Sequence, residues 1–359
     1  MIRSFGWSDA LQQDFAVHAE RGLIPGRITQ QQRGLYVIVT DLGELSAQVS
    51  GRLAHEAETS VDGGGYPAVG DWVAAAPRPA EQAATIQAVL PRRTAFVRKA
   101  AQSVATGQVV AANVDVALLV ASMNADFNAR RLERYLATAW QSGASPVVVL
   151  TKADLADNPA AAIAEAESVA FGAPVLAASA VTGEGLEALA AHLKPAETAV
   201  LVGSSGVGKS SLVNALAGGE VMAVGEIREA DARGRHTTTH RELVRLPSGA
   251  LVLDTPGMRE LGLIGADEGL STTFEDIEAI AGECRFRDCG HTNEPGCAVR
   301  GALESGALDE GRWRSFQKLQ RELAHLARKE DPVAREAHRR HWIGIHKAAR
   351  AHMKGRGKW

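Results

Sequence analysis

A glycine-rich stretch of the sequence matches the phosphate-binding pattern G-x-x-x-x-G-K-[ST] in full. It stands between an apolar run over residues 199–202 and a helical pattern over 209–216. Glycines let backbone N–H groups turn inward around phosphates, and the dipole of the following helix favours the same negative charge. Lys209 would reach the β- and γ-phosphates, and the Ser210 hydroxyl would ligate Mg²⁺. The predicted phosphate-binding residues are Gly203, Ser204, Ser205, Gly206, Val207, Gly208, Lys209, Ser210 and Ser211.

Two segments at the ends of apolar strands favour guanine as the base. One follows the apolar run 147–150 and the other follows a strand predicted over 174–177. The Asp154 carboxylate can accept hydrogen bonds from guanine N1–H and the 2-amino group, which adenine does not offer. Parallel α/β sheets bind ligands at the carboxyl ends of their strands, so both segments could reach one base. The predicted guanine-binding residues are Thr151, Lys152, Ala153, Asp154, Ser179 and Ala180.

The segment Asp254-Thr-Pro-Gly257 also follows an apolar strand, predicted over 250–253. Asp254 could hold a magnesium-bound water, and Gly257 could sense the γ-phosphate. The order of the segments differs from that of an ordinary small GTPase, in which the phosphate loop comes first. Here both base segments precede the loop. A circularly permuted domain would form the same site, because position in space and not order in the chain decides which strands are neighbours.

Three cysteines and one histidine stand within 14 residues, and these are the only cysteines of the chain. Three thiolates and one imidazole make a closed tetrahedral set for Zn²⁺, which is typical of a structural site. A chance cluster of buried cysteines and a redox pair are the alternatives. The odd number of cysteines and the lack of a C-x-x-C pair argue against redox chemistry. The predicted zinc ligands are Cys284, Cys289, His291 and Cys297.

The sequence around these motifs predicts three domains and a short leading segment. Residues 1–25 form an N-terminal extension, and residues 26–99 read as short strands without a helical pattern, which is typical of a small β-barrel. Apolar strands alternate with amphipathic helices over 100–266, which predicts a mostly parallel α/β sheet. Residues 267–359 read as helices around the cysteine cluster, continued by a basic helical tail.

Charge is divided unevenly along the chain. Residues 312–359 contain 14 Lys and Arg against four Asp and Glu, a net charge of +10, whereas the other 311 residues carry −13. A basic tail on an acidic body predicts a polyanionic partner, either nucleic acid or a membrane surface. The histidines and the lack of an apolar face from Trp342 onward favour RNA. Trp313, Trp342 and Trp359 could stack on bases or, alternatively, be buried against the cysteine cluster.

Composition excludes several classes of protein. With 359 residues, 45% of them apolar and 23% charged, the chain is neither disordered throughout nor collagen-like. No run approaches the roughly 18 apolar residues of a membrane span, and the N-terminus lacks the pattern of a secretory signal. We therefore expect a cytoplasmic protein that binds no membrane.

The motif order, the segment Gly234-Arg-His-Thr-Thr-Thr239 and the cysteine cluster closely resemble the bacterial small-ribosomal-subunit biogenesis GTPases, the RsgA/YjeQ family. The resemblance covers most of the chain. It implies an oligonucleotide/oligosaccharide-binding (OB) barrel that includes the segment Gly70-Asp-Trp-Val73, a circularly permuted G domain and a zinc module. It also implies a monomer that contacts ribosomal RNA. Such a protein would hydrolyse GTP to GDP with ribosome-stimulated turnover, assist late maturation of the small (30S) subunit and then dissociate.

The resemblance also suggests which residues act on the γ-phosphate. Met258 stands where many GTPases carry a glutamine that orients the attacking water, so another group must do this. In the family the candidate is a histidine of the switch segment, which is His236 here. One of the three threonines over 237–239, which we take as Thr238, would close on Mg²⁺ in the GTP state.

Two other functions stay open from the sequence. The chain could be a nucleotide-gated RNA-binding scaffold whose hydrolysis is incidental, in which case ribosomal subunits would not stimulate turnover. It could also be a small-molecule kinase with a phosphate loop. The guanine preference expected from Asp154 and the lack of a substrate domain argue against the kinase.

Overall fold

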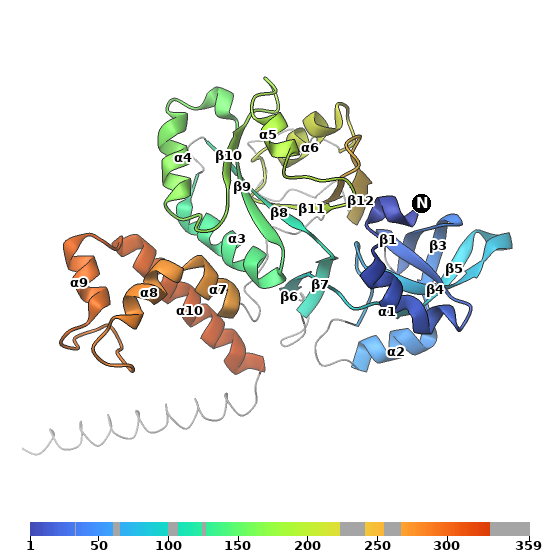
Figure 1. Cartoon of the computed structure of the whole chain (residues 1–359), viewed down its shortest axis with the longest axis horizontal. Coiled ribbons are helices and arrows are strands. Elements are labelled where there is room, and N and C mark those ends of the chain that lie inside the picture. Colours follow the sequence, from blue (N-terminus) through green and yellow to red (C-terminus); the bar gives the residue numbers. More distant parts are fainter. Residues whose placement is uncertain are drawn as a thin grey trace, which may run out of the picture.

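The computed structural model describes residues 1–32, 34–59, 65–99, 107–123, 127–222, 241–254 and 267–330. Within them a β-barrel, an α/β domain and a helical C-terminal module (residues 267–330) follow one another (Figure 1). The α/β domain lies in the middle. This arrangement confirms the predicted fold class, whereas the predicted boundaries at residues 25, 99 and 266 stay a prediction.

Five strands close the barrel in the order β1-β2-β3-β5-β4, and β4 returns to pair with β1. The β3–β5 pair is parallel and the others are antiparallel. Fully buried Ile28, Ile38 and Ile86 fill the interior. The expectation of strands without a helix is wrong, because a helix, α2, follows β3. The elements are β1 (Ile24–Gln32), β2 (Leu35–Thr40), β3 (Gly43–Val49), α2 (Gly51–Thr59), β4 (Trp72–Arg78) and β5 (Ala83–Val89).

The N-terminal segment packs on the barrel. It forms a 3-10 turn (Ile2–Phe5) and the helix α1 (Asp9–Ala19), which Ser8 caps by accepting from the Leu11 N–H. The Trp7 ring lies edge-on to Trp72 of β4, with centroids 4.8 Å apart, and to Phe15 of α1. The buried aromatic cluster therefore holds this segment against the barrel.

A six-stranded sheet forms the α/β domain in the order β10-β9-β8-β11-β13-β12. The first five strands are parallel, and β12 is antiparallel to β13. Buried residues of α3 and α4 pack on one face of the sheet, and those of α5 and α6 pack on the other. The strands are β8 (Val116–Ser122), β9 (Ser145–Thr151), β10 (Val175–Ala178), β11 (Thr198–Val202), β12 (Arg241–Arg245) and β13 (Leu251–Asp254). The helices are α3 (Ala129–Ser142), α4 (Pro159–Glu167), α5 (Leu186–Ala190) and α6 (Lys209–Ala217).

Barrel and α/β domain share one continuous sheet, because β1 also pairs with β12 through Gln30 and Glu242. A two-stranded hairpin of β6 (Ala95–Lys99) and β7 (Gly107–Ala112) lies between the two parts in the sequence. Its strands pair across the predicted boundary at residue 99. The barrel is therefore joined to its neighbour by backbone hydrogen bonds as well as by side chains.

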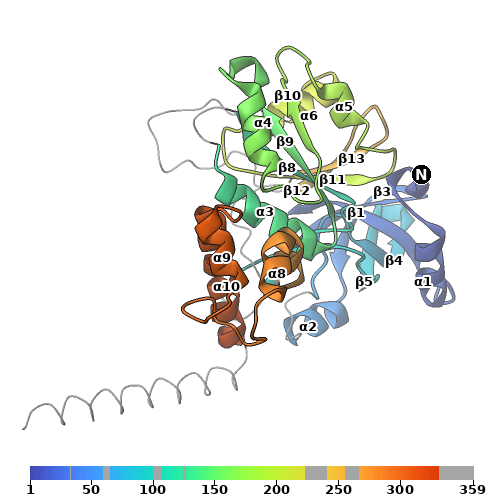
Figure 2. The ribbon, with the colours of Figure 1, turned by 60° about the vertical axis from the view of Figure 1, so that its left-hand side comes forward.

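The C-terminal module packs against α3 (Figures 1 and 2). Its helices are α7 (Asp267–Thr273), α8 (Glu275–Gly282), α9 (Ala298–Ser305) and α10 (Glu310–Glu330). The approach of α7 to α3 is close, since a Cβ at Gly269 would lie 2.1 Å from the Ala137 carbonyl oxygen. Trp313 and Phe316 of α10 are buried in the core of the module. For Trp313 the stacking alternative is therefore wrong and the burial alternative is right.

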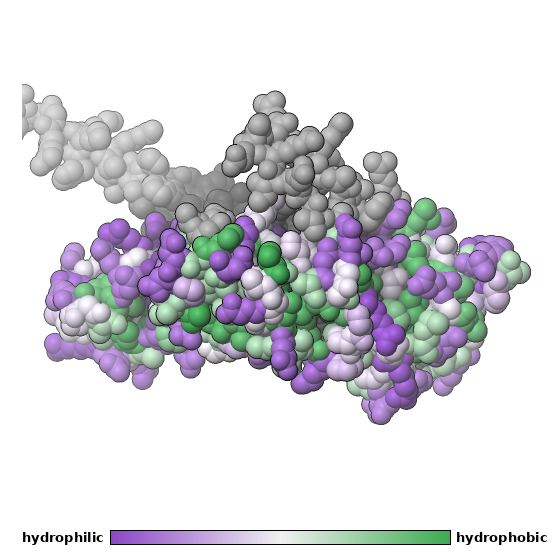
Figure 3. Space-filling model, turned by 90° about the horizontal axis from the view of Figure 1, so that it is seen from above, coloured by the Kyte–Doolittle hydropathy of each residue, from purple (hydrophilic) through white to green (hydrophobic). Residues whose placement is uncertain are grey.

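The first part of the predicted basic tail is a packed helix and not a solvated one. Arg312 of α10 is only 5% exposed. Trp342 and Trp359 lie outside the described residues. Among the helices that the structure describes, none is long and apolar enough to cross a bilayer. Hydrophobic and hydrophilic residues are interspersed over the coloured part of the face in Figure 3.

Candidate functional site

The phosphate loop connects β11 to α6 at the carboxyl edge of the parallel sheet. Close packing requires its first glycine, because a Cβ at Gly203 would lie 2.3 Å from the Val120 carbonyl oxygen on β8. Gly208 begins α6 with a φ of 94°, which glycine adopts without strain. The Lys209 Nζ donates to the carbonyl oxygens of Gly203 (2.8 Å) and Ser204 (2.6 Å). A cation therefore lies at the loop, beside the amides that phosphate binding requires.

Thr151 connects the predicted base segment to the phosphate loop. It is the last residue of β9, and it pairs with Ser122 of β8. Its hydroxyl oxygen lies 2.5 Å from the Val207 carbonyl oxygen and 3.2 Å from the Ala121 carbonyl oxygen. Both partners are acceptors, so the single hydroxyl proton is used within the protein. Two segments about fifty residues apart in the sequence are thus held together at one edge of the sheet.

The rest of the base segment turns away from β9 directly after Thr151. Lys152 has a φ of 59°, in the left-handed region, and a 3-10 turn over Ala153–Leu155 follows. Ala153 is buried, whereas the Asp154 side chain is exposed to solvent. The turn therefore presents the carboxylate at the surface of this edge, where a base can reach it.

The second base segment lies on the neighbouring strand, since β10 pairs Ala178 with Thr151. Ser179 follows it and is fully buried. Its hydroxyl accepts from the backbone N–H groups of Val181 (3.2 Å) and Thr182 (3.1 Å). Ser179 therefore shapes the turn that contains Ala180.

The predicted residues around the γ-phosphate are only partly covered by the structure. His236, Thr238 and Gly257 lie outside the described residues, and of Asp254 only the backbone is described. Asp254 ends β13, which runs parallel to β11. This strand therefore ends at the same edge as the phosphate loop, and the roles of the four residues stay predictions.

The four predicted zinc ligands bring their donor atoms within 4.8 Å of one another. The Cys284 and Cys297 sulfur atoms lie 4.0 Å apart, and the His291 Nδ1 is 3.5 Å from each of them. Around a tetrahedral zinc with bonds of about 2.3 Å to sulfur and about 2.0 Å to nitrogen, sulfurs lie about 3.8 Å apart and sulfur and nitrogen about 3.5 Å. The donor set and its spacing therefore fit one zinc ion.

Glu294 organises the loop that carries two of these ligands. Its carboxylate accepts from the backbone N–H groups of Gly290 (3.1 Å), Thr292 (2.8 Å) and Asn293 (3.0 Å). Hydrogen bonds from backbone amides, those of Glu294 itself and Thr292 foremost, lower the pKa of Glu294 to about 2. The Trp313 ring packs at a right angle to His291, with centroids 5.6 Å apart. The motifs did not identify Glu294. The available signal was an acidic residue between two predicted zinc ligands, His291 and Cys297.

Comparison with known proteins identifies the family. Residues 89–264 match the family model described as RsgA GTPase. The whole chain is 47% identical to the small ribosomal subunit biogenesis GTPase RsgA of Opitutus terrae, across 99% of that protein. The chain belongs to the RsgA GTPase family. A relative of the same name from Streptomyces coelicolor is 45% identical over 93% of this chain and 90% of its own length.

Solved structures agree with this assignment. YjeQ from Thermotoga maritima superimposes with a TM-score of 0.61 at 27% identity, over 84% of this chain and 98% of that one. YloQ, described as a circularly permuted GTPase, gives a TM-score of 0.56 at 25% identity, over 84% of this chain and 95% of that one. The resemblance to this family and the permuted order of the motifs are thereby confirmed.

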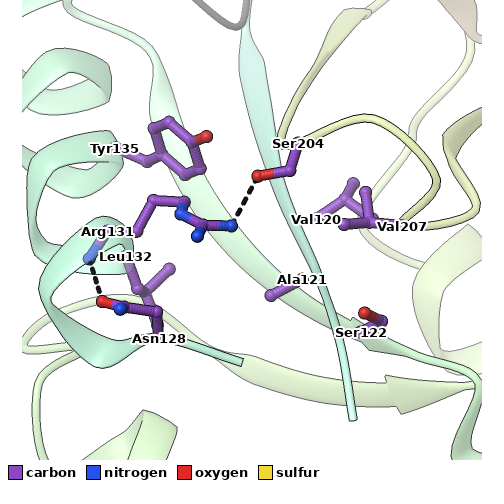
Figure 4. A pocket seen from close by; sticks show the side chains of 9 residues that line it. All are labelled: Val120, Ala121, Ser122, Asn128, Arg131, Leu132, Tyr135, Ser204 and Val207. Atoms are coloured by element: carbon purple, nitrogen blue, oxygen red, sulfur yellow. Dashed lines mark hydrogen bonds between the residues drawn. The ribbon is translucent and has the colours of Figure 1, made fainter. Parts of the chain in front are cut away.

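One residue beside the phosphate loop of this RsgA-family chain was missed by motif reading. Arg131 of α3 donates from Nη1 to the Ser204 Oγ, at 2.6 Å (Figure 4). The two residues are 73 positions apart, and no motif marks the arginine. A signal existed, because apolar strands alternate with amphipathic helices in this part of the sequence, and α3 follows the strand β8. Its first turn must therefore lie at the carboxyl edge of the sheet.

Proposed function

We propose that this chain binds GTP and Mg²⁺ at the phosphate loop, assists late maturation of the small ribosomal subunit and dissociates from it after hydrolysis. Membership of the RsgA GTPase family makes the chain a GTP-hydrolysing enzyme. The observation that carries the choice of partner is the 47% identity, over the full chain, to a small ribosomal subunit biogenesis GTPase. Such a partner implies work in the cytoplasm, and we propose that the chain acts there as a monomer.

For the nucleotide we propose that Lys209 exchanges its two carbonyl partners for the β- and γ-phosphates. The loop amides and the Lys209 ammonium would then stabilise the charge that develops during phosphoryl transfer. Ser210, Thr238 and Asp254 would hold Mg²⁺, which neutralises part of the same charge. Gly257 would sense the γ-phosphate, and His236 would orient the attacking water.

For the base we propose that Asp154, together with its neighbours in the turn and Ser179-Ala180, selects guanine. Asp154→Asn would place a donor opposite guanine N1–H and weaken GTP binding at least about a hundredfold. Xanthosine triphosphate, which has a carbonyl at position 2, should then bind the variant better than GTP does. Titration of both proteins with both nucleotides measures this, and an unchanged preference for GTP would remove Asp154 from the base site.

For the cysteine cluster we propose one structural Zn²⁺, held by Cys284, Cys289, His291 and Cys297. The supporting observation is the agreement of the donor distances with a tetrahedron. Four protein ligands leave no position for a reacting water. The ion would therefore fix the loop against Trp313 and α10, and take no part in hydrolysis.

For the ribosomal partner we propose contact with RNA through the chain beyond α10. Residues 331–359 contain eight Lys and Arg against two Asp and Glu. The positive charge suits the phosphate backbone, whereas the rest of the chain is acidic. Turnover stimulated by the subunit would follow if RNA contacts order the segment that contains His236.

The deciding experiment is GTP turnover of the purified chain alone, with small subunits and with large subunits. We expect stimulation by small subunits only, and Lys209→Ala supplies the background rate. His236→Ala should retain GTP affinity and lose about a hundredfold of the stimulated rate. Turnover that small subunits do not change would contradict the proposal and favour a scaffold with incidental hydrolysis.

A further inference from the structure

Arg131 lies at the phosphate loop although it belongs to another part of the chain. Asn128 caps α3 by accepting from the Arg131 backbone N–H (2.9 Å), so the side chain leaves the first turn of the helix. From there it reaches the Ser204 hydroxyl (Figure 4). Both residues line a cavity of about 10 Å³, together with Val120, Tyr135 and Val207 among others.

Two cations meet at one residue of the loop. The Arg131 guanidinium donates to the side chain of Ser204, and the Lys209 ammonium donates to its carbonyl oxygen. If Lys209 moves to the phosphates as proposed above, Ser204 loses one of these partners and keeps the other. Arg131 would then hold the first part of the loop while its amides surround the nucleotide.

The same two helical turns of α3 are held by the C-terminal module. Glu133 is fully buried, and its Oε1 accepts from Arg130 (2.6 Å) and from Arg312 of α10 (3.0 Å). The next residue, Arg134, pairs with Glu322 of α10 at 2.8 Å. The pairs with Arg312 and Glu322 fasten the first two turns of α3 to the C-terminal module. Their effect is to set the position of the segment that carries Arg131.

We propose that Arg131 is a positioning residue for nucleotide binding, acting through Ser204, and that the C-terminal module sets its place by fixing α3. The inference rests on the proposed use of the loop for GTP. A charge-assisted hydrogen bond of this kind is stronger than a neutral one. It keeps the loop amides oriented toward the phosphates before the nucleotide arrives, so its loss weakens binding more than it slows the chemical step.

The test is steady-state GTP hydrolysis by the full chain without ribosomes, with KM and kcat measured separately. Arg131→Gln should raise KM about tenfold and leave kcat within about twofold. Ser204→Ala should do the same, and the double variant should be no worse than either single one, because both remove one interaction. Arg131→Lys should restore KM to within about threefold, since an ammonium can also donate to the Ser204 hydroxyl.

Two controls separate this inference from its alternatives. Arg52→Gln makes the same substitution on the exposed barrel helix α2 and should change neither constant. Lys209→Ala tests the nucleotide site itself, and unchanged GTP affinity in that variant would overturn the proposed function. The role of Arg131 is overturned if Arg131→Gln leaves KM unchanged while Lys209→Ala abolishes GTP binding. It is also overturned if the effects of Arg131→Gln and Ser204→Ala on KM add independently in the double variant. A loss of thermal stability with an unchanged KM would also overturn it, because that result marks a structural arginine.

Discussion

The α/β domain is joined to each of its neighbours around a buried arginine, but the two arginines have different partners. On the barrel side, Arg27 donates to neutral acceptors only, the Phe5, Gly70 and Asn113 carbonyl oxygens and the Thr198 hydroxyl. On the other side, Arg312 donates to two carboxylates, a bidentate pair with Asp276 (2.8 and 2.7 Å) and the buried Glu133, and to one carbonyl. Burial lowers the pKa of Arg27 to about 10, as expected for a cation without a directly bonded anion.

The two junctions also differ in their distance from the nucleotide edge. Thr198 begins β11, so Arg27 attaches the barrel at the end of that strand remote from the phosphate loop. The β1–β12 pair is a separate attachment, at Glu242, which pairs with Asp254 at the nucleotide edge. Glu133 lies in the first turns of α3, two residues from Arg131 at the loop. Of the two arginines, Arg312 thus has the shorter path to the phosphate loop, through Glu133 and Arg131 of α3. The barrel is joined to the sheet by strand pairing and by hydrogen bonds to neutral groups, whereas the module is joined to α3 by ion pairs.

Loss of zinc should affect one junction and spare the other, and this is the largest effect expected. Cys289→Ser should lose one equivalent of metal and unfold the C-terminal module, because zinc binding is coupled to folding in small modules. The barrel junction should survive. GTP should still bind, with a KM raised by no more than the roughly tenfold expected for Arg131→Gln, because α3 loses the contacts that set the place of Arg131. Metal analysis and calorimetry of the purified chain check this, with Ser305→Ala as a matched control on α9. Absence of zinc from the parent chain would refute the closed metal site.

Matched substitutions of the two arginines should have unequal costs. Arg312→Met leaves Glu133 and Asp276 with one partner fewer in a buried setting and should destabilise the module by about 3 to 5 kcal/mol. Arg27→Met leaves only neutral acceptors and should cost about 1 to 3 kcal/mol. Adding Glu133→Gln to Arg312→Met should recover part of the loss. Calorimetric transitions of the four proteins measure this, and equal costs for the two arginines would show that the carboxylates are not what distinguishes the junctions.

Truncation of the basic tail should leave both junctions intact and have the smallest effect on the fold. A chain ending at Glu330 keeps α10 and its buried Trp313, whereas a chain ending at Gly311 would lose part of the core of the module. The chain ending at Glu330 should bind small subunits more weakly than the full chain does, and its affinity should depend less steeply on salt. Each lost phosphate contact removes about 0.7 to 0.9 from the slope of log K against log salt. Equal slopes for the two proteins would assign RNA binding to another surface.

Local sequence was enough to predict that the phosphate-loop and base segments lie at one edge of the sheet and that the cysteine cluster is close together, and the binding roles of these residues stay predictions. Residues 203–211 are contiguous and run from the loop into the first turn of α6, and their glycines indicate the backbone conformation that phosphate binding requires. The four zinc ligands likewise stand close together in the chain. The strand that precedes each motif could be read from its apolar run, so the shared edge of the sheet followed as well. These parts could be predicted because the residues of each motif are neighbours in the sequence.

The junctions could not be predicted, because their partners are far apart in the sequence. Glu133 and Arg312 are 179 residues apart, and Arg27 and Thr198 are 171 apart. Each reads on its own as an ordinary charged or polar residue of a helix or strand. Arg312 was counted with the basic tail for this reason, although it is buried in an ion-pair network. Only packing distinguishes such an arginine from a solvated one.

The most direct test of the path through α3 is hydrogen–deuterium exchange of the full chain with and without a non-hydrolysable GTP analogue. Binding should slow exchange in the phosphate loop, in α3 and in helices of residues 267–330. Exchange at the barrel junction, in β1 and β4, should be unchanged. A nucleotide effect confined to the loop and the barrel strands, with none in α3 or α10, would contradict the coupling of the nucleotide site to the C-terminal module.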